Sequence, residues 1–109
     1  MATFQIKVGD TEPSIQATLK GASGAAINLT GASVKLLLQH RITGAWLSFV
    51  CTLVTPTEGI VRYDWLTTDV TQSGRWDAEF EVTFAGGAIQ TVPNGDGEYF
   101  TFVVTEDLN

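Results

Sequence analysis

Apolar and polar residues alternate most regularly between positions 76 and 84. Every even position in this stretch is apolar, from Trp76 through Phe80 to Phe84, and every odd position is acidic or threonine. Side chains of a β-strand point alternately to its two faces, so this pattern predicts a strand with one face in a core and the other toward water. Strands of this two-sided kind are typical of antiparallel sheets.

The same alternation recurs in short segments along the rest of the chain. Stretches rich in Gly, Pro, Asn and Asp separate these segments about every 8–12 residues, and no stretch keeps a helical period for more than one turn. Seven to nine short strands at this spacing predict an all-β sandwich or barrel. Because parallel neighbours need long crossover connections and the loops are short, we expect antiparallel pairing throughout.

The inward positions of these strands define the expected core. Its members are large aliphatic or aromatic residues: Ile15, Leu19, Val34, Leu36, Leu38, Phe49, Val61, Tyr63, Trp65, Trp76, Phe80, Val82, Phe100 and Phe102. Residues 47–53 read as one further strand, with Cys51 on its inward face as a buried small apolar side chain. A chain of 109 residues with this core is expected to form a single domain, residues 1–109.

Charge narrows the range of partners. The net charge is −6, from 12 acidic and 6 basic residues, and the basic residues are scattered. Phosphate backbones need clustered cations, so we expect no nucleic-acid partner. The chain has no apolar stretch of a signal peptide or of a membrane span, so we expect synthesis in a cytoplasm, no export signal and no membrane partner.

Three motifs in order suggest a family. They are Gly9-Asp10-Thr11-Glu12-Pro13 with Thr18-Leu19, then Leu29-Thr30-Gly31-Ala32-Ser33-Val34, then Asp69 followed by Gly74-Arg75-Trp76-Asp77-Ala78-Glu79-Phe80. In this order and spacing the chain resembles, over nearly its whole length, the immunoglobulin-like N-terminal domain of phage baseplate upper proteins. Small stand-alone phage and prophage proteins share the resemblance.

The resemblance implies an immunoglobulin-like β-sandwich in a virion protein that packs against other virion proteins. It implies neither catalysis nor particular binding residues. The family usually has an aromatic residue, often Tyr, two positions after the Gly, where a hydroxyl bonds to upstream backbone as in the tyrosine corner. Trp76 stands there in this chain and carries only an indole N–H, so that bond is either lost or replaced.

The single histidine and the single cysteine do not indicate a metal site or a catalytic site. His40 is the only histidine and Cys51 the only cysteine, so no zinc site of nitrogen and sulfur ligands can be assembled, and we expect no metal or other cofactor. His40 reads as a solvated residue at the end of a strand. No partner that would orient it as a catalytic base is evident.

Acidic residues alternate at two places. Asp77, Glu79 and Glu81 share one strand face, where catalytic carboxylates, a partner-binding face and a solvated acidic face are the alternatives. The flat outer face of a strand favours the solvated one. Asn94, Asp96 and Glu98 suggest calcium, but the spacing departs from the calcium-loop pattern, which favours a polar turn.

Three apolar residues fall on faces that the alternation assigns to solvent: Trp46, Val50 and Leu37. Exposed aromatic and aliphatic side chains are typical of protein interfaces. The alternatives are that another layer covers both faces of these strands, or that a bulge shifts the alternation.

Together with these residue patterns, the resemblance implies a non-enzymatic structural protein of a tailed-phage virion, made in a bacterial host. It would dock to tail, baseplate or capsid neighbours in a symmetric multi-copy assembly, through its sheet edges and the apolar outer patch. The alternative is a carbohydrate- or receptor-binding adhesin module that stacks exposed aromatic residues on sugar. An enzyme is not expected, because no nucleophile–base pair or metal set is evident.

Overall fold

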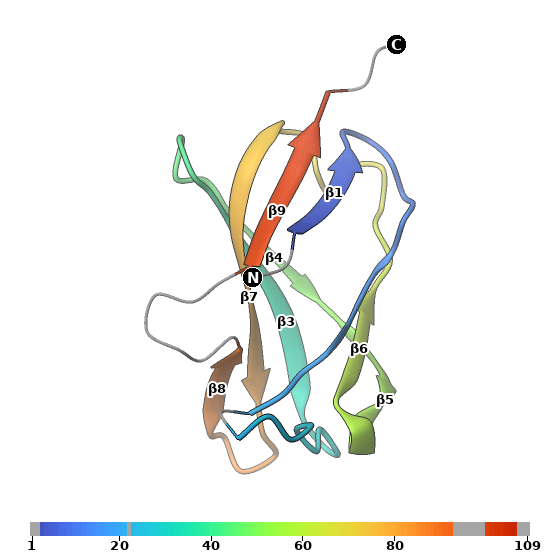
Figure 1. Cartoon of the computed structure of the whole chain (residues 1–109), viewed down its shortest axis with the longest axis vertical. Coiled ribbons are helices and arrows are strands. Elements are labelled where there is room, and N and C mark those ends of the chain that lie inside the picture. The colour runs from blue at the N-terminus through green and yellow to red at the C-terminus, as the bar shows by residue number, and fades with distance from the viewer. Residues whose placement is uncertain (1–2, 22, 93–99, 107–109) are drawn as a thin grey trace.

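The computed structural model describes residues 3–21, 23–92 and 100–106. Within these residues the chain forms nine β-strands in two sheets, which is an immunoglobulin-like β-sandwich (Figure 1). The sequence-based prediction of an all-β sandwich with seven to nine short strands is confirmed.

The larger sheet, called sheet A, holds six strands in the order β1-β9-β7-β3-β4, with β8 pairing β7 beside this path. Its strands are β1 (Thr3–Lys7), β3 (Ser33–His40), β4 (Trp46–Val50), β7 (Gly74–Thr83), β8 (Ile89–Val92) and β9 (Phe100–Thr105). The regular alternation at 76–84 belongs to β7, which lies at the centre of this sheet.

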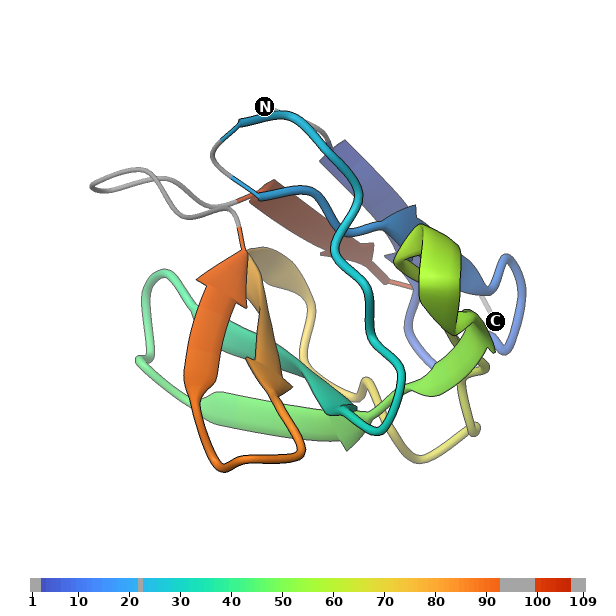
Figure 2. The same cartoon turned by 90° about the horizontal axis from the view of Figure 1, so that it is seen from below.

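The smaller sheet, sheet B, has the order β2-β6-β5. Its strands are β2 (Ile15–Thr18), β5 (Thr52–Thr55) and β6 (Ile60–Tyr63). The chain changes sheets at Cys51, which separates β4 from β5, so the expected continuous strand over 47–53 is wrong. A 3₁₀ turn, η1 (Pro56–Glu58), follows β5 and is the coiled segment in Figure 2.

Strand β7 is long enough to pair with two successive strands along one edge. Its first half, Gly74–Ala78, pairs with β9, and its second half, Phe80–Thr83, pairs with β8. Both pairings are antiparallel, so β8 and β9 run in the same direction along β7. The other edge of β7 pairs with β3 over the whole length of β3.

The expectation that every pairing is antiparallel is wrong at the two ends of the described chain. β1 and β9 pair in parallel, with Thr3 opposite Thr101 and Lys7 opposite Thr105, and Figure 1 shows both arrows pointing the same way. A parallel neighbour needs a long connection. Here nearly the whole domain connects the two strands, so the shortness of the individual loops placed no limit on this pair.

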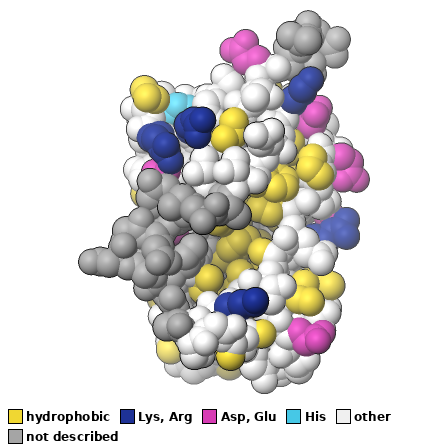
Figure 3. Space-filling view, viewed as in Figure 1, with side chains coloured by type: hydrophobic (Ala, Val, Ile, Leu, Met, Phe, Trp, Pro, Cys, Tyr) yellow, Lys and Arg dark blue, Asp and Glu magenta, His cyan; other side chains and the backbone are white. Residues whose placement is uncertain are grey.

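The core lies between the two sheets. Eleven of the fourteen expected core residues are buried, and the other three, Phe49, Tyr63 and Phe100, are partly exposed while packing against the same cluster. Apolar side chains gather along the middle of the face in Figure 3, and charged groups lie mainly around its rim. The buried set also includes residues that the sequence analysis did not select: Ile6, Leu29, Val70, Ala78, Val92 and Val104.

An aromatic cluster joins the two sheets around Trp65, which is 2% exposed. Its ring contacts Phe4 and Phe102 of sheet A at centroid distances of 6.1 and 5.2 Å. Phe49 and Tyr63 meet the same ring edge-on at 5.5 and 5.0 Å. Such geometries add to the free energy gained from burying the rings.

Candidate protein-interaction surface

The structure brings the three anomalous apolar residues onto one outer face of sheet A. Trp46 and Val50 lie on β4 with exposed fractions of 63% and 68%, and Ser48 lies between them. Leu37 of β3 is directly opposite Ser48 and is therefore the diagonal neighbour of both. We call Trp46, Val50 and Leu37 the outer patch.

The register explains why these side chains point outward. Strands β3 and β4 pair without interruption from Lys35–Val50 to Gln39–Trp46, so no bulge shifts the alternation. The exposure of Trp46 and Val50 also means that none of the described residues covers this side of β4. Both alternatives to an exposed apolar patch are therefore removed for the described residues.

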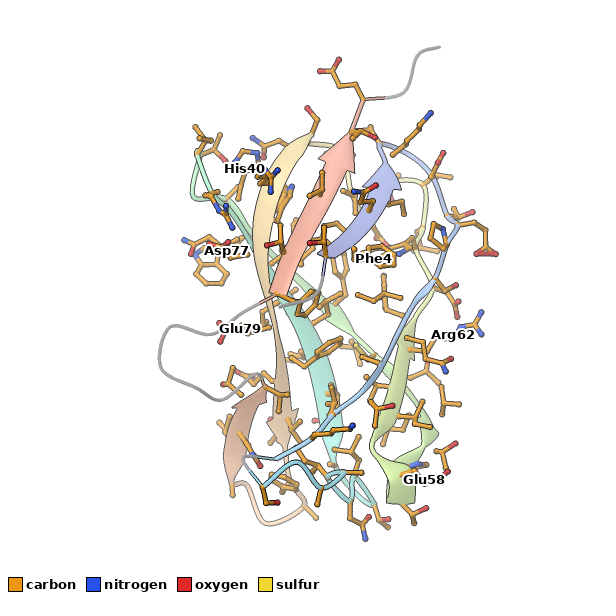
Figure 4. The ribbon with its side chains drawn as sticks, in the orientation of Figure 1. Phe4, His40, Glu58, Arg62, Asp77 and Glu79 are labelled. Atoms are coloured by element: carbon orange, nitrogen blue, oxygen red, sulfur yellow. The ribbon has the colours of Figure 1, made fainter. Side chains whose placement is uncertain are left out.

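A column of acids lies on the same face, two strands away from β4. Asp77, Glu79 and Glu81 of β7 are opposite Gln39, Leu37 and Lys35 of β3. Figure 4 shows Asp77 and Glu79 projecting to the same side of the ribbon. All three acids are half-buried among neighbouring strands.

The acid column lies on the outer face of β7, the central strand of sheet A. At its upper end, Asp77 accepts hydrogen bonds from the Arg41 guanidinium at 2.7 and 3.1 Å. The side chains of this pair are 39% and 33% exposed, so solvent screens their attraction. Among the described residues, this arrangement is that of a partly solvated acidic face.

His40 is buried, not solvated as the sequence analysis expected. Its Nδ1 accepts hydrogen bonds from the backbone N–H groups of Ile42 and Thr43 at 3.2 and 3.1 Å. Nε2 therefore carries the proton and donates to the Ser73 carbonyl at 2.9 Å. The ring meets Trp76 edge-on at 4.9 Å. Because both nitrogens are occupied, His40 fastens the hairpin after β3 to the start of β7.

Trp76 retains a hydrogen bond of the kind that a tyrosine corner makes. Its indole N–H donates to the Gln72 carbonyl at 3.2 Å, four residues upstream. The ring is 1% exposed. The indole N–H thus makes a bond to upstream backbone, as the tyrosine hydroxyl does in a tyrosine corner.

Cys51 is buried, as the alternation predicted, at the point where the chain crosses between sheets. Burial raises the pKa of its thiol to about 11, and a backbone hydrogen bond involving Leu36 lowers it by less. A thiol in this state is poorly ionised at neutral pH and makes a weak nucleophile.

Asp69 has a role that the sequence analysis did not foresee, since it appeared there only as a residue of the third motif. Its carboxylate accepts hydrogen bonds from the Tyr63 hydroxyl at 2.7 Å and from the Leu66 backbone N–H at 2.8 Å. Burial, and then the contact with this carboxylate, raise the pKa of Tyr63 well above its usual range. The motif residue Asp69 thus holds the 66–69 turn against β6.

A second polar group lies on the surface of sheet B. The Asp64 carboxylate accepts hydrogen bonds from the Ser14 hydroxyl at 2.5 Å and from the Arg62 guanidinium at 2.8 Å. The Ser14 bond, and next the Arg62 bond, hold the pKa of Asp64 below its ordinary value. The Ser14 contact ties the segment before β2 to the end of β6, whereas the Arg62 contact lies within the end of β6 itself.

The candidate calcium residues Asn94, Asp96 and Glu98 lie outside the described residues. Elsewhere, in the part of the chain that the structure describes, no group of three or more His, Cys, Asp or Glu residues is arranged to hold a metal ion. Over the same residues, no helix has the length and apolar character needed to cross a membrane.

Comparison with known proteins gives evidence on the fold only. No protein-family model matches this chain, and no curated protein matches it in sequence. Among solved structures, the crystal structure of CopC from Methylosinus trichosporium OB3b is similar, with a TM-score of 0.56 and 12% sequence identity. The match covers 100% of this chain and 89% of that one. At this identity the likeness shows a shared β-sandwich fold and nothing about binding.

Proposed function

We propose that this chain is a non-enzymatic structural protein of a tailed-phage virion, and that it docks to neighbouring virion proteins through the outer patch and the adjoining sheet edge. The observation that carries the proposal is the placement of Trp46, Val50 and Leu37 together around Ser48, with Trp46 and Val50 largely exposed. The order of the three sequence motifs supports the virion setting.

The proposed mechanism is geometric. A sandwich with a continuous core is rigid, so its outer face can be presented to a neighbour without reordering the backbone. Burial of an aromatic anchor such as Trp46 is the kind of contact that dominates interface energetics. In a symmetric particle each copy makes the same contact, so modest individual contacts add up through multivalency.

The adhesin alternative is less well supported. A sugar-stacking platform needs two or more exposed aromatic rings in one plane. The other two tryptophans, Trp65 and Trp76, are 2% and 1% exposed, and Trp46 is the only aromatic side chain in the described residues that is mostly exposed. The arrangement therefore favours a protein neighbour over a glycan.

The test has two stages. Mass spectrometry of particles purified from the phage or prophage that encodes the chain should find it at a fixed number of copies per particle. Particles lacking the chain would overturn the proposal. Trp46→Ser should then reduce incorporation, whereas Ile89→Ser, which replaces another exposed apolar residue away from the outer patch (64% exposed), should not. Equal incorporation of both variants would remove the outer patch from the mechanism.

A further inference from the structure

Among the described residues, five strands have only one neighbour in their sheet, and β4 differs from the other four. Unpaired strand edges invite association, and natural proteins protect them with charges, prolines or bulges. β1 ends in Lys7, β2 follows Pro13, β5 runs into Pro56 with a shifted register, and Pro93 follows β8. β4, with the sequence Trp-Leu-Ser-Phe-Val, has no charge, proline or bulge within its length or in the two residues on either side.

The backbone of β4 also presents its unpaired groups beside the exposed side chains. The N–H of His40 bonds to the Ala45 carbonyl at 2.8 Å, and that of Cys51 bonds to the Val34 carbonyl at 2.9 Å. These bonds mark hydrogen-bonded pairs at both ends of the β3–β4 ladder, and such pairs alternate with non-hydrogen-bonded ones. The β4 residues in the non-hydrogen-bonded pairs, whose N–H and C=O groups point to the free edge, are Trp46, Ser48 and Val50.

We propose that β4 pairs antiparallel with β4 of a second copy of this chain, about a two-fold axis through Ser48. In this register Trp46 of each copy is opposite Val50 of the other, and the two Ser48 residues face each other. Trp–Val is a favourable cross-strand combination of an aromatic and a β-branched residue. The three edge-facing residues of each copy could form about six backbone hydrogen bonds across the axis.

The distribution of charge permits a second copy at this edge. β4 itself carries no charge, and the acids of β7 lie two strands away from it. In the joined sheet the two acid columns would be five strand spacings apart, about 24 Å, which is well beyond the screening length at physiological salt. Each copy has a net charge of −6, so the remaining repulsion is long-range and salt should strengthen the association.

This pairing does not depend on the virion role. It would join the outer patches of two copies into one strip across the two-fold axis, with Trp46 and Val50 of both copies side by side. A neighbour of another kind could still contact that strip from its outer side. Absence of the chain from particles and absence of self-association are therefore separate results.

Ser48→Pro is the most selective test. The Ser48 N–H points to the free edge, so proline at this position removes no hydrogen bond within the chain, and proline is tolerated on edge strands with this orientation. It removes both Ser48 N–H groups from the proposed seam. We expect sedimentation equilibrium of the whole chain to show a monomer–dimer equilibrium that Ser48→Pro weakens at least about tenfold.

A matched pair of lysine substitutions serves as the control. Ser48→Lys and Gln5→Lys each place a cation on the exposed outer side of an edge strand of sheet A, on β4 and β1 respectively. Only Ser48→Lys brings two like charges together across the axis, so only this variant should lose the dimer. Circular dichroism and the melting temperature of each variant establish that the monomer is folded.

Cross-linking tests the register. A short bifunctional maleimide should join two copies of Ser48→Cys but not of Lys35→Cys, because positions 35 of the two copies would be about 20 Å apart. A wild-type chain that stays monomeric at all concentrations overturns the proposal. So does a dimer that survives Ser48→Pro, one that Gln5→Lys dissolves equally, or one that added salt dissociates.

Discussion

The imidazole of His40 lies against the bare Cα of Gly74. A β-carbon on Gly74 would stand 2.5 Å from Nε2 of His40, closer than real contacts of this kind come. Gly74 also has a φ of +128°, a conformation that side-chain-bearing residues rarely adopt. The first residue of β7 is therefore glycine for two reasons, and one of them is the histidine that fastens the preceding hairpin.

Gly74→Ala should destabilise the domain by about 2–5 kcal/mol, because it combines backbone strain with a steric clash. His40→Ala should cost about 2–4 kcal/mol through the lost hydrogen bonds and packing. In the double variant the clash disappears, so the combined loss should be smaller than the sum of the two. Chemical denaturation of the four proteins measures this coupling, and strict additivity would show that the contact is not important.

The indole hydrogen bond of Trp76 leads to a second prediction. Trp76→Phe keeps an aromatic ring in the core but removes the N–H that bonds to Gln72 and part of the buried volume. We expect a loss of about 2–4 kcal/mol in unfolding free energy. Trp46→Phe, which makes the same chemical change at a site 63% exposed, should change it by less than about 0.5 kcal/mol.

Measurement by urea denaturation distinguishes these two sites directly. Similar losses at both positions would contradict the corner role of Trp76, since that role requires its cost to exceed the cost at the exposed site.

The facing of β7 supplies a third prediction. Phe80 is 4% exposed and stacks on Phe100 with ring centroids 5.5 Å apart. Phe80→Ala should therefore cost about 3–5 kcal/mol, from lost burial and the cavity left behind. Ile89→Ala, at an exposed position opposite Thr83, is the control and should have little effect. A thermal or chemical melt in which Phe80→Ala loses under 1 kcal/mol would contradict the assigned facing.

Alternation predicted which side of each strand faces the core, because it depends only on the period of the side chains. The same rule, applied strictly, also predicts that His40 faces the core. Residues 34, 36 and 38 point inward, so residue 40 does too, and it pairs with Trp76. Its polarity led the sequence analysis to place it in solvent. The acceptor that makes burial of its Nε2 possible, the Ser73 carbonyl, lies 33 residues away in the sequence. The pattern of residues around His40 does not predict that contact.

The parallel β1–β9 pair and the split at Cys51 could not be read from the sequence for a related reason. Alternation gives the facing of a strand but says nothing about which strand lies beside it. Residues 47–53 keep their alternation across Cys51 even though the chain changes sheets there. The outer patch was found because its three residues break the polarity of a face, which is a local signal. That Trp46 and Val50 lie on a free edge strand could be recognised only from the order of the strands.

Cys51 supplies the last prediction, which concerns chemistry at the junction of the two sheets. Its thiol is 7% exposed and has a pKa of about 11, so at pH 8 only about 0.1% is ionised and little of that is accessible. Because the pKa is raised by burial, unfolding should lower it and expose the sulfur together. We expect a thiol reagent such as Ellman's to leave the native chain unmodified over hours and to titrate one thiol per chain at once in guanidinium.

Ser48→Cys is the control, since it adds a cysteine on the exposed face of β4 and should react immediately in the folded protein. Rapid modification of the wild-type chain without denaturant would mean that the β4–β5 junction opens in the native state, and the crossing between sheets would then be a flexible joint.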